Sequence, residues 1–115
     1  MKNNSEKISS LSNSKIKFIS SLSLRKNRQS SGLFVAEGER ICREAVLNGW
    51  TPKFLVFNSE REKEEGINYL IKYCIEKKGS TLAVSEKILS KISKKDNPQM
   101  IIGVFEQKFL NLQKI

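Results

Sequence analysis

The stretch Leu33-Phe34-Val35-Ala36-Glu37-Gly38-Glu39-Arg40 sets the pattern for much of the chain. Residues 33–36 form an apolar run that is too short for a helix and is bounded by turn-forming residues. Such a run is typical of a strand covered on both faces, as in a parallel sheet. Glu37 and Gly38 end the strand, and a helix is predicted from Glu39 to Asn48, with Gly49 placed for a left-handed cap. The stretch therefore predicts a strand followed directly by a helix.

The same alternation continues toward the C-terminus. Short apolar runs predict strands at 54–57, 81–84 and 100–105, and Ser85 is placed to cap a short helix before the last of them. The clearest helix runs from about Glu62 to Lys78, with Gly79 just past its end. Its apolar stripe consists of Ile67, Leu70, Ile71, Cys74 and Ile75. The alternation predicts an α/β fold, a three-layer α/β/α sandwich with a largely parallel sheet.

The N-terminal part carries weaker signals. Residues 1–11 are polar with little periodicity, and we expect a flexible tail there. A helix should begin after the capping side chains of residues 12–14 and fade near 25–28, before a loop at 29–32. We place one domain at residues 12–107 and a linker toward a further domain at 108–115.

The charge of the chain favours a polyanionic partner. The net charge is +9 and the sequence pI is about 9.7. Residues 1–43 hold nine basic and three acidic residues, a balance of +6, whereas residues 44–115 hold twelve and nine, a balance of +3. Such an excess of positive charge attracts RNA or DNA, and an acidic membrane surface less readily. Because most of the excess lies in residues 1–43, we expect the binding surface mainly in the first third of the chain.

The sequence offers little material for catalysis. It has no histidine, no glycine-rich phosphate loop and no fingerprint of a nucleoside cofactor. Cys42 and Cys74 lie among apolar residues, which favours two core positions over a metal site and suits the reducing cytoplasm. No apolar run reaches the ~18 residues of a membrane span. We therefore expect no catalytic, cofactor or metal site in this segment.

One basic cluster is the candidate binding site. Its cations lie around the first predicted helix and the end of the first strand: Lys15, Lys17, Arg25, Lys26, Arg28 and Arg40. Arginine and lysine suit phosphate groups, although a solvated basic face would have the same composition. Asn13 belongs to the candidate site but is also a natural helix cap. Glu37 could contact RNA or orient Arg40 or Arg28 through an ion pair, while Gly38 serves the backbone turn.

The order of these features resembles a known family. Asn13, Ile16-Lys17, Leu22, Arg28 and the run from Leu33 to Arg40, with Ala45 and Gly49 after it, resemble the N-terminal substrate-binding domain of SpoU/TrmH-type RNA 2'-O-ribose methyltransferases. Ser85 to Ile92 and the Asn97-Pro98-Gln99 loop also fit, so the similarity covers about residues 8–107. Ser14 and Met100 depart from the pattern, where proline and a small residue are common.

The resemblance implies a fold similar to that of kink-turn-binding ribosomal proteins and a role in recognising structured rRNA or tRNA. It also implies that the intact protein has a second, knotted domain that binds S-adenosylmethionine, transfers the methyl group and forms a homodimer. Two alternatives remain open at this point. One is a stand-alone RNA-binding module of the ribosomal-protein type. The other is a protein-interaction domain whose charge keeps it in solution.

Overall fold

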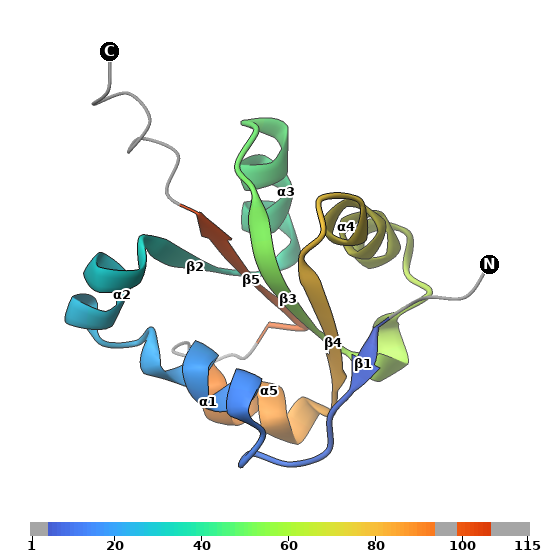
Figure 1. Ribbon diagram of the computed structural model, residues 1–115. Coiled ribbons are helices and arrows are strands. Elements are labelled where there is room, and N and C mark those ends of the chain that lie inside the picture. Colours follow the sequence, from blue (N-terminus) through green and yellow to red (C-terminus); the bar gives the residue numbers. More distant parts are fainter. Residues whose placement is uncertain (1–4, 94–98, 107–115) are drawn as a thin grey trace.

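A computed structural model describes residues 5–93 and 99–106 of the chain (Figure 1). The elements in chain order are β1 (Glu6–Lys7), α1 (Ser14–Ser21), α2 (Arg25–Ser31), β2 (Leu33–Glu37), α3 (Glu39–Leu47), β3 (Pro52–Asn58), the 3-10 helix η1 (Ser59–Arg61), α4 (Glu65–Glu76), β4 (Ser80–Val84), α5 (Glu86–Ile92) and β5 (Ile101–Glu106). Strands and helices alternate from β2 onward, which confirms the predicted α/β class.

The described residues form one five-stranded sheet in the order β1-β4-β3-β5-β2. Strands β1, β4 and β3 pair in parallel, whereas β5 runs antiparallel to both β3 and β2. Four strands therefore share one direction and β5 alone is inverted, so that the sheet is mixed. Ser93, just after α5, donates to Glu37 at the carboxyl end of β2, so α5 ends near the carboxyl ends of the parallel strands. A strand that starts from this end of the sheet runs antiparallel to them, as β5 does.

Helices cover both faces of the sheet and create two cores (Figure 1). Helices α3 and α4 cover one face, where the largest buried side chains include Phe57, Phe105 and Leu70. Helices α1 and α5 cover the other face, over a core that includes Ile16, Leu22 and Leu89. This arrangement is the predicted three-layer sandwich. Strand β2 forms one edge of its sheet.

The structure corrects the interpretation of residues 5–11 as part of a flexible tail. Glu6 and Lys7 form β1, which pairs with Leu82 and Ala83 of β4. Ile8, which follows, is only 6% exposed and packs in the core beneath α1 and α5. One apolar side chain in a polar stretch gave no periodicity, but its burial anchors the segment at the edge of the sheet. The rest of the predicted tail, at 1–4, and the predicted linker at 108–115 lie outside the described residues.

The first helical region consists of two helices where the sequence predicted one helix and a loop. Helix α1 ends at Ser21, and Leu24 takes an extended conformation before α2 begins. Three consecutive backbone hydrogen bonds of the tighter i to i−3 kind close the turn, from Leu22 N to Ile19 O and from the next two amides. The predicted loop at 29–32 is helical up to Ser31, since polar side chains in this segment bond to helix carbonyls instead of ending the helix.

Two smaller differences concern α4. The helix starts at Glu65, three residues later than predicted, because η1 and its turn occupy the preceding residues. Lys78 supplies the left-handed residue at the C-terminal end, with φ of 67°. Gly79 has a different role from the predicted cap: a Cβ there would lie 2.6 Å from the Pro52 carbonyl oxygen and 2.7 Å from Cys74 Sγ. Within residues 5–93 and 99–106, no helix has the length and apolar character needed to span a membrane.

Candidate nucleic-acid interface

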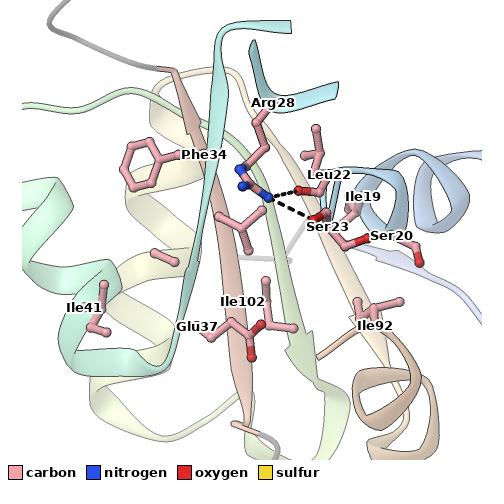
Figure 2. Close-up of a pocket in the computed structure, with 12 residues that line it drawn as sticks. Ile19, Ser20, Leu22, Ser23, Arg28, Phe34, Glu37, Ile41, Ile92 and Ile102 are labelled. Atoms are coloured by element: carbon pink, nitrogen blue, oxygen red, sulfur yellow. Dashed lines mark hydrogen bonds between the residues drawn. The ribbon is translucent and has the colours of Figure 1, made fainter. Parts of the chain in front are cut away.

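A groove of about 400 Å³ lies beside β2, on the face of the sheet that α1 covers (Figure 2). Strands β2 and β5 form its floor, and α1, α2 and α5 surround it. The groove exists because β2 is an edge strand and the helices above it are only seven or eight residues long. Apolar side chains and two charged ones face into it, among them Ile19, Arg28, Val35, Glu37, Ile92 and Ile102.

Arg28 closes one end of the groove. Its Nη1 atom donates to the Leu22 carbonyl oxygen at 2.8 Å and to the Ser23 carbonyl oxygen at 3.0 Å. These carbonyls belong to the turn after α1, where the helix can no longer satisfy them itself. A charged donor that bridges two main-chain acceptors holds α1 and α2 together, so Arg28 stabilises the wall of the groove.

Glu37 lies at the other end of the groove and is only 8% exposed. Its Oε1 atom accepts a hydrogen bond of 2.6 Å from the Ser93 hydroxyl, at the C-terminal end of α5. The neighbouring Gly38 has φ of 112° and donates its amide to the Ile101 carbonyl oxygen. A Cβ at residue 38 would lie 3.2 Å from Gln99 Oε1, so the turn from β2 to α3 packs closely against the start of the β5 segment.

Exposed cations surround the groove on the α1, α2 and α5 side. Arg25 and Lys26 are exposed on α2. Lys17 lines a second, adjoining groove between α1 and α5, which shares Ser20 and Ile92 with the first. Lys91 of α5 lines the same adjoining groove and was not among the residues predicted from the sequence. The sequence could have indicated Lys91, because the apolar residues of α5 define a buried face and leave Lys91 on the outer face of that helix.

The other predicted site residues lie elsewhere or have structural contacts. Asn13 caps α1, since its Oδ1 accepts from the amides of Lys15 at 2.8 Å and Ile16 at 3.3 Å. Lys15 Nζ lies 2.7 Å from Glu6 Oε1 on β1, at the sheet edge opposite β2. Arg40, with its side chain 83% exposed, lies 3.6 Å from Glu44 on α3 and does not line either groove. The predicted site is therefore divided: Arg28 and Lys17 line the two adjoining grooves, and Arg25 and Lys26 are exposed on α2, the helix that carries Arg28.

The cysteines provide no reactive group. Burial raises the pKa of the Cys42 thiol and of the Cys74 thiol to about 12, so both remain protonated at neutral pH. Cys42 Sγ donates to the Ala36 carbonyl oxygen at 3.4 Å, as a small core residue does. No group of three metal-ligating side chains occurs in the described part of the chain.

Comparisons with known proteins connect this architecture to RNA methyltransferases. An rRNA methyltransferase from Sinorhizobium meliloti is 33% identical over 90% of this chain and 37% of its own, with a TM-score of 0.79. The structure of an rRNA methyltransferase from the same organism with AdoMet bound is also 33% identical, over 96% and 40% of the two chains, with a TM-score of 0.79. An RNA 2'-O ribose methyltransferase is 27% identical over 88% and 37%, with a TM-score of 0.73.

This chain thus spans less than half the length of the solved structures that it matches. No curated protein matches the sequence at a significant level. These structures confirm the predicted resemblance to RNA ribose methyltransferases. The family model of the MRM3-like substrate binding domain matches residues 13–103, from the cap of α1 into β5. Since that match covers most of the chain, the protein belongs to the MRM3-like substrate-binding domain family.

Proposed function

We propose that this domain binds structured ribosomal or transfer RNA for an S-adenosylmethionine-dependent RNA 2'-O-ribose methyltransferase of the SpoU/TrmH type. The family match over residues 13–103 is the observation that carries the proposal. The domain recognises the substrate and contributes no catalytic group. We propose a cytoplasmic location for the intact protein.

The charge distribution supports an RNA-facing surface at α1, α2 and α5. Lys17, Arg25, Lys26 and Lys91 are exposed there, next to grooves with apolar floors. Cations on such a surface displace the counterions condensed on RNA, which drives binding by an electrostatic term that weakens with salt. Arg28 contributes less directly, because its guanidinium holds the turn after α1.

We assign methyl transfer to a further domain of the intact enzyme. The AdoMet-bound Sinorhizobium meliloti structure supports this division, because the chain corresponds to only 40% of that protein. The described residues contain no cluster of metal ligands, and the two thiols are protonated at neutral pH. We place the cofactor site and the contacts of a homodimer in that further domain.

A binding titration tests the proposal. The chain should bind a folded ribosomal RNA fragment or a transfer RNA, with affinity that falls steeply between about 50 and 200 mM salt. Calorimetry with S-adenosylmethionine should show no binding at micromolar cofactor concentrations. Failure to bind any structured RNA at 50 mM salt would contradict the RNA-binding role. A micromolar dissociation constant for S-adenosylmethionine would contradict the division of labour.

A further inference from the structure

Phe18 places a large apolar ring on the outer surface of α1. The buried stripe of this helix does not include it, because Ile16 and Ile19 are 1% and 4% exposed whereas Phe18 is 40% exposed. The other exposed side chains of α1 are two serines and Lys17. An aromatic ring is therefore accessible to a ligand on a helix whose outer surface is otherwise polar.

A second aromatic side chain supports this ring from the side of the sheet. The ring centroids of Phe18 and Phe54 lie 5.8 Å apart at an interplanar angle of 46°, a separation typical of aromatic pairs. Phe54 is half-buried on β3, a strand that pairs with β4 on one side and with β5 on the other. Because a central strand positions Phe54, the contact limits the orientations of Phe18. A ring that is oriented in advance loses less entropy when a ligand binds.

The surroundings of the ring are basic. Helices α1 and α2 together contain five basic residues and no acidic one. Lys17 is exposed and adjacent to Phe18 in the chain, and the residues one helical turn away from Phe18, Ser14 and Ser21, have small side chains. RNA-binding proteins hold unpaired nucleotides with this combination, in which the base stacks on an aromatic ring while cations meet the phosphates.

An exposed aromatic ring on the opposite face has different surroundings. Tyr69 of α4 is 43% exposed, and its ring centroid lies 6.5 Å from that of Tyr73. The groove that Tyr69 lines includes Glu65 as well as Arg43, so its one basic residue is balanced by a carboxylate that repels phosphate. Phe18 thus differs from Tyr69 in the charge around it and not in exposure, which favours α1 as the helix that meets RNA.

We propose that Phe18, supported by Phe54, stacks against one unpaired base of the bound RNA. Stacking uses the flat face that every nucleobase has, so this site favours unpaired nucleotides over paired ones without selecting a sequence. The inference rests on the proposed RNA-binding function and adds a base contact to it.

The probes are two RNA hairpins with the same stem and a single bulged position, which holds adenosine in one hairpin and an abasic ribose in the other. Both hairpins carry the same number of phosphates, so a difference in affinity comes from the base. The parent chain should bind the adenosine hairpin about 5- to 150-fold more tightly than the abasic hairpin. Salt should weaken binding of both without changing this ratio, because stacking is not a phosphate contact.

Three variants assign the preference to the ring of Phe18. Phe18→Leu keeps an apolar side chain but has no aromatic face, so it should bind the two hairpins with nearly equal affinity. Phe18→Tyr keeps the ring and should retain the preference. Tyr69→Leu is the matched control, because it removes a ring of similar exposure from α4, and it should also retain the preference. Circular dichroism checks that each variant folds.

A fluorescence measurement decides the question if Phe18→Leu does not fold. Trp50 is the only tryptophan in the sequence, so Trp50→Phe combined with Phe18→Trp places a single tryptophan at the proposed site. A base that stacks on an indole ring quenches its fluorescence. The adenosine hairpin at saturation should therefore quench this variant more than the abasic hairpin does, and equal quenching overturns the inference.

The outcomes separate this inference from the function on which it rests. Equal affinity of the parent chain for the two hairpins overturns the stacking site and leaves the RNA-binding role intact. A preference for adenosine that survives in a folded Phe18→Leu variant also overturns the inference, because another group would then hold the base. Absence of binding to both hairpins and to the folded RNAs at about 50 mM salt contradicts the proposed function itself.

Discussion

The two faces of the sheet are built differently, and the difference separates stability from binding. On one face, α3 and α4 have nine and twelve residues and bury aromatic side chains such as Phe57 and Phe105 completely. On the other, the eight-residue α1 and the seven-residue α2 and α5 leave a groove beside β2. Helices α3 and α4 cover the strands beneath them, whereas α1, α2 and α5 leave part of the edge strand β2 accessible in the groove. Arg28 and Lys17 of the candidate site line grooves on the more open face, whereas Arg40 lies on α3.

The largest expected effect is on the closed face. Leu70 of α4 is 1% exposed, so Leu70→Ala should lower the free energy of unfolding by about 2–5 kcal/mol. Leu47→Ala is the matched control, because Leu47 is 72% exposed on α3 and its truncation should change stability by less than about 0.5 kcal/mol. Denaturant titration measures both. A decrease below about 1 kcal/mol for Leu70→Ala would mean that this face does not hold the fold together.

The next effect concerns the wall of the groove. Arg28→Ala removes a charged donor from two main-chain carbonyls and should lower the free energy of unfolding by about 1.5–3 kcal/mol. Arg25→Ala, one turn away and exposed, should change it by less than about 0.5 kcal/mol. A thermal or denaturant melt measures both variants. Equal stability of the two would show that the Arg28 hydrogen bonds do not stabilise the fold, and Arg28 would then be a candidate RNA contact like Arg25.

A smaller effect is expected at the start of α1. Asn13→Ala removes the acceptor for the amides of Lys15 and Ile16 and should cost about 0.5–2 kcal/mol. Asn13→Asp keeps an acceptor at the helix N-terminus and should remain within about 0.5 kcal/mol of the parent. If RNA affinity falls in Asn13→Ala while stability does not, Asn13 contacts RNA and is not mainly a cap.

The part of the fold that was predictable from sequence is the part with strong periodicity. In the predicted stripe, Ile67, Leu70, Ile71 and Cys74 are buried, as the helical spacing predicted, and Ile75 is half-buried at its end. The strand from Leu33 is also in place. Ile8 and the break at Leu24 were not predictable, because each depends on contacts distant in sequence or on turn geometry. The inversion of β5 was not predicted either, because the sequence shows the strand but not the end of the sheet from which it starts.

The candidate site was predictable in composition but not in geometry. Counting charges located the basic region but could not distinguish Lys17 from Lys15. Lys17 lines a groove, whereas Lys15 forms an ion pair with Glu6 of β1. Lys91 joins Lys17 only because α5 packs beside α1. Glu37 accepts a hydrogen bond from Ser93, which is 56 residues away in the chain, and no sequence pattern predicts such a contact.

The most direct test asks which face meets RNA. Arg25→Ala with Lys26→Ala removes two exposed cations beside the groove, and Lys63→Ala with Lys72→Ala removes two exposed cations just before and on α4, at the opposite face. Binding of a structured ribosomal RNA fragment should be measured across a salt series. The first pair should weaken binding and flatten the log–log salt dependence by about 0.7–0.9 for each phosphate that the variant no longer neutralises, whereas the second should leave both unchanged. A greater weakening of RNA binding in the α4 pair would show that RNA binds the closed face and would contradict the account.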